Sequence, residues 1–116
     1  MYIGVIYIYR MDIHLMIEGC QGFEWDKGNS LKSWLKHRVT EQEAERIFFN
    51  KPLLLVVDEQ HSQYESRFRA MGYTDENRFL YIVFLVRNNL IRVISARDMN
   101  KKERVIYEDF KTNTKI

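Results

Sequence analysis

The segment from His61 to Arg69 carries residue types that could do chemistry on a phosphodiester. Read as a β-strand, the segment places alternate side chains on opposite faces. One face would hold His61, Glu65, Arg67 and Arg69, and the other would hold apolar side chains such as Phe68. A proton acceptor, a proton donor and fixed cations in one row meet the needs of phosphodiester cleavage. An exposed amphipathic strand with an ion pair is the alternative interpretation.

The composition is that of one folded domain with a mildly basic charge. Of the 116 residues, 46% are hydrophobic and 14% aromatic, which argues against disorder. A net charge of +2 is too small for a protein that coats nucleic acid nonspecifically. An RNA site must therefore come from local clustering of charge. The single cysteine, Cys20, excludes an internal disulfide, and no Cys/His spacing suits zinc. We expect a cytoplasmic protein that needs no metal and no cofactor.

Residues 1–22 are apolar but are interrupted by charged side chains. The longest apolar run is too short to span a bilayer, and no basic region precedes it, so we expect neither an anchor nor a signal peptide. An added edge strand and a start upstream of the true one are both open interpretations. We divide the chain into an extension at 1–22, a working domain at 23–110 and a C-terminal tail at 111–116.

Two short helices are predicted ahead of the sheet, and Phe23-Glu24-Trp25 is a candidate short strand in front of them. Asp26 can cap a helix over about 27–38. Its apolar stripe is Leu31, Trp34 and Leu35, and its basic residues are Lys32, Lys36 and Arg38. Thr40 and Glu43 form a capping-box pattern that begins a second helix, with Ala44, Ile47 and Phe48 on its buried side. Helices this short are marginal alone, so each stripe is expected to pack on a sheet.

The remaining chain indicates four antiparallel strands and a helix. The predicted strands are 53–57, 63–73, 79–86 and 90–97, with a turn at 74–77. The first is a continuous apolar run, so we expect it to be covered on both faces. Asn88-Asn89 predicts a two-residue hairpin loop. Asn100 with Glu103 predicts the cap of a C-terminal helix that docks through Val105, Ile106 and Phe110.

The order of these elements predicts an α+β fold. It consists of one twisted antiparallel sheet of about four strands, with two N-terminal helices and a C-terminal helix.

The predicted hairpin determines on which face of the sheet Arg92 and Arg97 lie. Arg92 and Arg97 are five positions apart, so strict alternation puts them on opposite faces of the sheet. They can share a site only if Arg97 lies past the strand end, or if a β-bulge near residues 95–96 resets the alternation. The alternative roles are structural: Arg92 extends from a sheet edge, and Arg97 holds the C-terminal helix through Asp98 or Glu103.

Several short segments follow one another over residues 23–108. They are Phe23-Glu24-Trp25-Asp26, Trp34-Leu35-Lys36-His37 with Val39, Glu43-Ala44 with Phe48-Phe49, His61 with Glu65-Ser66-Arg67, Gly72, Ile91-Arg92-Val93-Ile94-Ser95-Ala96-Arg97, and Lys102-Glu103-Arg104 with Tyr107-Glu108. In this combination the chain resembles the BrnT toxin family of bacterial type II toxin–antitoxin systems, part of the RelE-like group. Arg38 stands where that family usually has glycine, and residues 1–22 have no counterpart in the resemblance.

The resemblance implies a ribonuclease that blocks translation and is held inactive by an antitoxin. It also implies a RelE-like sheet flanked by helices. The expected partners are therefore RNA, with ribosome-bound messenger included, and a ribbon-helix-helix antitoxin. We expect a hetero-oligomer with the antitoxin, leave a homodimer open, and expect no membrane partner.

Roles for the matched positions follow from metal-free RNA cleavage, in which the 2′-OH attacks the neighbouring phosphate. Either Glu65 or His61 would accept the proton of the 2′-OH, and the other would protonate the leaving 5′-oxygen. The arginines expected to clamp the phosphate are Arg67, Arg92 and Arg97. The residues expected to hold the flanking RNA backbone are Lys36, His37 and Arg69.

A non-catalytic interaction module is the competing class. The strands at 79–86 and 90–96 are apolar on both faces, and a partner could cover part of one face. A DNA-binding regulator is disfavoured because the sequence contains no helix-turn-helix with a basic recognition helix. Digestion of RNA by the purified protein would separate the enzyme from the module.

Overall fold

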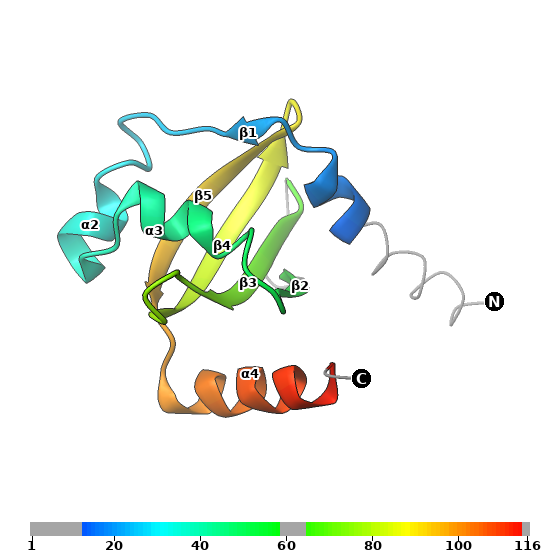
Figure 1. The fold of residues 1–116 in the computed structure, drawn as a ribbon. Coiled ribbons are helices and arrows are strands. Elements are labelled where there is room, and N and C mark those ends of the chain that lie inside the picture. Colours follow the sequence, from blue (N-terminus) through cyan, green and yellow to red (C-terminus); the bar gives the residue numbers. More distant parts are fainter. Residues whose placement is uncertain (1–12, 59–64, 115–116) are drawn as a thin grey trace.

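The computed structural model describes residues 13–58 and 65–114, and the predicted α+β class is confirmed. Its named elements in chain order are β1 (Gly22–Phe23), α2 (Lys32–His37), α3 (Glu41–Arg46), β2 (Leu54–Asp58), β3 (Arg67–Tyr73), β4 (Phe79–Arg87), β5 (Leu90–Asp98) and α4 (Lys101–Asn113) (Figure 1). Residues 13–18 are a further helical segment ahead of β1.

Five strands form one sheet in the order β1-β5-β4-β3-β2, which are the four predicted strands and a short strand at the position of the Phe23-Glu24-Trp25 candidate. This short strand is β1, which pairs in parallel with β5 and places Gly22 opposite Leu90. The other neighbouring strands are antiparallel. The predicted hairpin loop is confirmed, because Asn88 and Asn89 take φ values of 54° and 61°, as a type I′ turn requires.

The expectation that the strand at 53–57 is covered on both faces is wrong. β2 is the edge strand of the sheet, and Val56 is exposed on it. A continuous apolar run is typical of strands buried between two layers. Leu55 and Val57 face the main core, so Val56 between them points to the opposite face, where its side chain meets solvent.

One face of the sheet carries the main hydrophobic core. Its fully buried side chains include Ile47, Leu80, Ile82, Phe84 and Val93. Figure 1 shows α3 lying across this face. Ile13 is also buried here, and Met16 and Ile17 pack against the same core. The described part of the predicted extension therefore contacts the core, while the boundary after residue 22 stays a prediction.

The second predicted helix is confirmed as α3, together with its capping box. The Glu43 backbone N–H donates to Thr40 Oγ1 at 3.0 Å, and the Thr40 N–H donates to Glu43 Oε1 at 3.0 Å. Ala44 and Ile47 are buried as predicted.

The first predicted helix is wrong in length and orientation. α2 covers only Lys32–His37, and Asp26 does not cap it; the Asp26 carboxylate accepts the Gly28 N–H at 2.8 Å instead. The predicted buried stripe of Leu31, Trp34 and Leu35 is exposed. The buried residue of α2 is Ser33, whose Oγ accepts the Ala96 N–H of β5 at 2.8 Å. The helix turns its polar side inward because this strand N–H needs an acceptor.

The C-terminal helix α4 has the predicted Asn100–Glu103 capping box and docks through the predicted Phe110 together with Tyr107, which was not predicted. Tyr107 is fully buried, and its hydroxyl donates to the Pro52 carbonyl at 2.6 Å. Val105 and Ile106, which were expected to dock, are exposed. The side chains packed with Tyr107 include Met71, Phe79, Tyr81 and Phe110. α4 thus covers one end of the sheet face opposite the main core.

Candidate functional site

A β-bulge in β5 decides which face each arginine occupies. Val83 pairs with Ser95 and Phe84 pairs with Val93, so Ile94 is the extra residue of β5. The bulge resets the alternation of side chains, as the shared site of the two arginines requires. The bulge lies at residue 94, one position before the predicted position at residues 95–96.

The bulge leaves Val93 and Ala96 both buried in the core and turns Arg92 and Arg97 to the opposite face. Arg67 and Arg69 also face away from the core, because Phe68 and Ala70 between and after them are buried in it. We call this surface the arginine face; its arginines are Arg67 and Arg69 from β3, Arg87 from β4, and Arg92 and Arg97 from β5.

A hollow of about 360 Å³ opens on the arginine face. Its lining residues are Lys32, Asp58, Arg67, Arg69, Tyr81, Val83, Ile94 and Ser95. The volume lies at the small end of the range for ligand pockets. Two predicted site residues, Arg67 and Arg69, line it together with Lys32, which reaches it from α2.

Arg69 is anchored inside this hollow by two neighbours. Its Nη2 lies 3.3 Å from Asp58 Oδ1, and its Nη1 donates to the Tyr81 hydroxyl at 3.2 Å. The Asp58 side chain is nearly buried. Arg69 Nε is buried and has no hydrogen-bond partner among the described residues. A buried donor of this kind is rare in folded proteins and marks a place where an acceptor would be favourable.

Arg92 is held at the edge of the arginine face by two carboxylates. Its Nη1 lies 3.1 Å from Glu24 Oε1 and 2.9 Å from Asp26 Oδ2, and its Nη2 lies 3.0 Å from Asp26 Oδ1. The hydrogen bond from Arg92 lowers the pKa of the Asp26 carboxyl below its ordinary value. Arg92 therefore joins the segment after β1 to β5 and does not line the hollow.

Arg97 is engaged with α4. Its Nη1 and Nη2 donate to the two carboxylate oxygens of Glu103 at 2.7 Å and 2.8 Å. Its guanidinium carbon lies 4.3 Å from the centroid of the Tyr81 ring. The hydrogen bond from Arg97 lowers the pKa of the Glu103 carboxyl. These contacts match the structural alternative for Arg97, in which it ties down the C-terminal helix.

Glu65 precedes β3 and pairs with Arg87 near the hairpin. The Arg87 Nη2 and Nε lie 2.7 Å and 3.1 Å from its two oxygens. This hydrogen bond, together with the charges of Arg67 and Arg92, lowers the pKa of the Glu65 carboxyl. An ionised carboxylate suits a proton acceptor better than a donor. His61, the other predicted acid or base, lies outside the described residues.

Lys36 and His37 lie at the exposed end of α2 and do not line the hollow. Arg78 fixes this end, because its Nη2 and Nη1 donate to the backbone carbonyls of His37 and Arg38 at 3.0 Å and 2.8 Å. The same guanidinium pairs with Glu43 and Asp98. Arg38 takes φ 55° as the C-cap of α2, in the left-handed region that favours glycine.

Sequence reasoning missed three residues of the hollow that could take part in binding: Lys32, Asp58 and Tyr81. The sequence could have indicated Lys32, since it lies one helical turn before Lys36 and therefore on the same side of the predicted helix. Asp58 and Tyr81 had none, because their place depends on the pairing of β2, β3 and β4.

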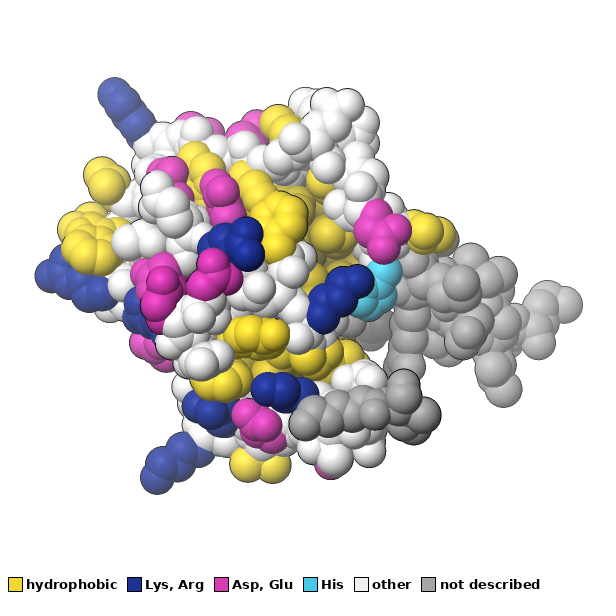
Figure 2. Space-filling model, viewed as in Figure 1, with side chains coloured by type: hydrophobic (Ala, Val, Ile, Leu, Met, Phe, Trp, Pro, Cys, Tyr) yellow, Lys and Arg dark blue, Asp and Glu magenta, His cyan; other side chains and the backbone are white. Residues whose placement is uncertain are grey.

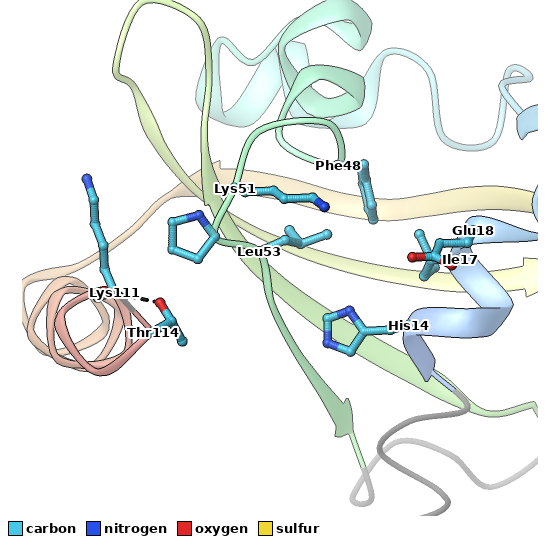
Figure 3. Close-up of a pocket in the computed structure, with 9 residues that line it drawn as sticks. His14, Ile17, Glu18, Phe48, Lys51, Leu53, Lys111 and Thr114 are labelled. Atoms are coloured by element: carbon cyan, nitrogen blue, oxygen red, sulfur yellow. Dashed lines mark hydrogen bonds between the residues drawn. The ribbon is translucent and has the colours of Figure 1, made fainter. Parts of the chain in front are cut away.

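A larger hollow, of about 580 Å³, lies elsewhere and is lined by none of the predicted site residues. Figure 3 shows His14, Ile17 and Glu18 of the helical segment facing Leu53 and Phe48 across it. Lys51, Pro52, Lys111 and Thr114 complete the lining. The walls are mainly apolar.

Among residues 13–58 and 65–114, no group of three or more His, Cys, Asp or Glu side chains could hold a metal ion. None of the helices in this described part is both long and apolar enough to cross a membrane.

Comparison with known proteins gives one family. Residues 25–103 match a family model described as "Ribonuclease toxin, BrnT, of type II toxin-antitoxin system". None of the curated proteins matches the chain.

Proposed function

Because the chain belongs to the BrnT family of ribonuclease toxins of type II toxin–antitoxin systems, we propose that it cuts RNA on the arginine face. In this proposal it is a metal-independent endoribonuclease of RelE-like type that inhibits translation. The observation that carries the proposal is the hollow lined by Arg67, Arg69 and Lys32 on a face where the Ile94 bulge also places Arg92 and Arg97. Cations gathered around a concave site can bind a phosphodiester and stabilise the charge that develops on it.

The reaction would be an attack of the RNA 2′-OH on the adjacent phosphorus. The 2′-oxygen forms a bond to phosphorus while the bond to the 5′-oxygen breaks, which leaves a cyclic phosphate and a 5′-hydroxyl. One proton moves from the 2′-OH to a base, and another moves from an acid to the 5′-oxygen. Glu65, which is paired with Arg87 and does not itself line the hollow, is proposed as the base, and His61 is then proposed as the acid.

Arg67 and Arg69 are proposed to bind the non-bridging phosphate oxygens, since both line the hollow. Arg92 and Arg97 hold carboxylates and do not line the hollow, so we propose that they position the surrounding elements without clamping the phosphate. Lys36 and His37 remain proposed contacts for RNA beyond the cleaved bond.

The type II toxin family implies an antitoxin partner. We propose that this antitoxin is of the ribbon-helix-helix type and forms a hetero-oligomer with the chain. We propose further that the target is RNA in the cytoplasm, with ribosome-bound messenger as one form of it.

The competing proposal, a non-catalytic module that binds through an apolar sheet, has less support. The apolar side chains of β4 and β5 that could form such a surface are buried, among them Leu80, Ile82, Phe84, Leu85 and Val93. The exposed large apolar side chains of the described residues lie mostly on helices.

The test is digestion of a single-stranded RNA by the purified protein in excess EDTA, beside a translation assay with ribosomes. Cleavage that yields a 2′,3′-cyclic phosphate is the expected product, and a matched DNA strand should stay intact because it lacks the nucleophile. Cleavage that EDTA abolishes would contradict the metal-independent mechanism. Absence of cleavage in both assays would favour the interaction module.

A further inference from the structure

The outward side of α2 carries an apolar stripe that does not pack on the sheet. Leu31, Trp34 and Leu35 are 60%, 41% and 67% exposed. They occupy positions i, i+3 and i+4, so they form one continuous strip along the helix. The helix is instead attached to the sheet through Ser33, on its other side. Apolar side chains arranged this way on a surface typically mark an interaction site.

The charged residues of α2 itself have one sign, while Arg78 holds Glu43 and Asp98 near the C-terminal end of this helix. α2 has no acidic residue in its first turn and ends in Lys36 and His37, with Arg38 as its C-cap. Figure 2 shows hydrophobic and basic side chains together at the edge of the molecule where Figure 1 places α2. Within the described part of the chain, neither Lys32 nor Lys36 forms an ion pair, whereas Arg69, Arg78, Arg87, Arg92 and Arg97 each have a carboxylate within 4.0 Å.

We propose that this α2 patch, defined as Leu31, Lys32, Trp34, Leu35, Lys36 and Arg38, binds an acidic amphipathic helix of the antitoxin. The inference rests on the proposed function only in taking the antitoxin as the partner. A partner helix with apolar residues at the same spacing would cover the stripe, and its carboxylates would neutralise the flanking lysines.

RNA fits the apolar stripe of this patch less well than a protein helix does. Leu31 and Leu35 can neither stack on bases nor donate a hydrogen bond to phosphate. Trp34 could stack, but the Arg38 guanidinium already lies 5.1 Å from its ring centroid. Two exposed leucines therefore favour a protein partner over a nucleic acid.

The position of the patch also gives the antitoxin a route to inhibition. Lys32 belongs to the patch and also lines the hollow on the arginine face. Carboxylates of a segment bound on α2 would thus lie close to the cations proposed to bind phosphate, and would compete with RNA for them.

The experiment measures the affinity of the full-length chain for its antitoxin, defined as the protein whose co-expression restores growth. The variant L31Q/L35Q removes the apolar surface while keeping residues that suit a helix. We expect its Kd to rise by about tenfold or more, since central apolar contacts dominate interfaces, with RNA cleavage unchanged. Val105→Gln removes an equally exposed apolar side chain, 69% exposed on α4, and should change neither property.

The sign of the partner's charge is tested at one position. Leu35→Glu and Leu35→Lys lose the same apolar contact but add opposite charges. The glutamate variant should bind several times more weakly than the lysine variant, and the difference should shrink in high salt. Circular dichroism of each variant confirms that the fold is retained.

Wild-type affinity in L31Q/L35Q, or equal affinity of the two Leu35 variants, would overturn the proposal. Unchanged antitoxin affinity with reduced cleavage would also overturn it and assign the patch to RNA. Failure of the proposed function has a different signature, namely an Arg67→Ala variant that cleaves RNA normally, and leaves the binding result standing.

Discussion

Tyr81 joins two arginines of the arginine face: its ring lies under the Arg97 guanidinium, 4.3 Å away, and its hydroxyl accepts a hydrogen bond from Arg69 Nη1 at 3.2 Å. Arg97 in turn holds Glu103 of α4. One buried tyrosine thus fixes an arginine inside the hollow and an arginine that anchors a helix.

Arg67→Ala is expected to lower RNA cleavage by about 10²–10³, the usual effect of removing one group that stabilises a developing negative charge. The variant should fold normally and should relieve growth arrest in cells that lack the antitoxin. The matched control is Arg46→Ala, which removes an exposed arginine of α3 that pairs with Asp75. Full toxicity of Arg67→Ala would show that the site is assigned to the wrong residues.

Tyr81→Phe keeps the ring under Arg97 and removes only the hydroxyl that accepts from Arg69. We expect kcat to fall about fivefold, the equivalent of one hydrogen bond of ~1 kcal/mol, because Arg69 is less well positioned. Tyr73→Phe is the control, since its hydroxyl donates to the Lys51 carbonyl instead. An effect on KM alone, or an equal loss in both variants, would argue against a positioning role.

The features that the sequence predicts well are local. The capping boxes at Thr40 and Asn100 and the Asn88-Asn89 loop depend on residues within three positions of one another. The sequence predicts that Arg92 and Arg97 can share a face only if a bulge lies between them, because residues five positions apart otherwise lie on opposite faces of a strand. The structure supplies the bulge at Ile94.

The features that the sequence does not predict depend on distant partners. α2 turns its apolar stripe outward because Ser33 satisfies the N–H of Ala96, 63 positions away. Asp26 binds Arg92 across 66 positions, which removes it from the role of a helix cap. Hydrophobic periodicity reports that a helix has an apolar side, but not whether that side meets the sheet or a partner.

Arg97→Ala is expected to lower the free energy of unfolding by about 1–3 kcal/mol, through the loss of two charge-assisted hydrogen bonds to Glu103 and the contact with Tyr81. Cleavage at low temperature should fall far less than in Arg67→Ala. Urea denaturation measures the stability, and a double-mutant cycle with Glu103→Gln measures the coupling. If Arg97→Ala kept full stability but lost cleavage, Arg97 would instead be assigned to binding the phosphate.

The stability of the protein should depend on acid through Asp98 and Glu103. Hydrogen bonds from Arg78 and Arg97 lower the pKa of these carboxyls below their ordinary values of 3.8 and 4.5. In acid the unfolded chain therefore binds more protons than the folded one. The stabilisation is present above about pH 5 and is lost as the pH falls through the lowered pKa values.

Urea midpoints measured from pH 7 to pH 3 test this dependence. Asp98→Asn and Glu103→Gln should each be less stable than the wild type at pH 7 and should lose less stability on acidification. Asp109→Asn, an exposed carboxylate of α4, is the control and should follow the wild-type curve. Parallel curves for all four proteins would contradict the assignment.

Arg38 occupies a left-handed position, φ 55°, at the end of α2, where a side chain is unfavourable. Arg38→Gly and Arg38→Ala both remove the contact with Trp34, so their difference isolates the backbone. We expect the glycine variant to be more stable than the alanine variant by about 1 kcal/mol, measured by urea denaturation. Equal stability would mean that the left-handed C-cap is not kept in solution. Since Arg78 binds the His37 and Arg38 carbonyls presented by this turn, a change of the cap would also shift α2 and its exposed stripe.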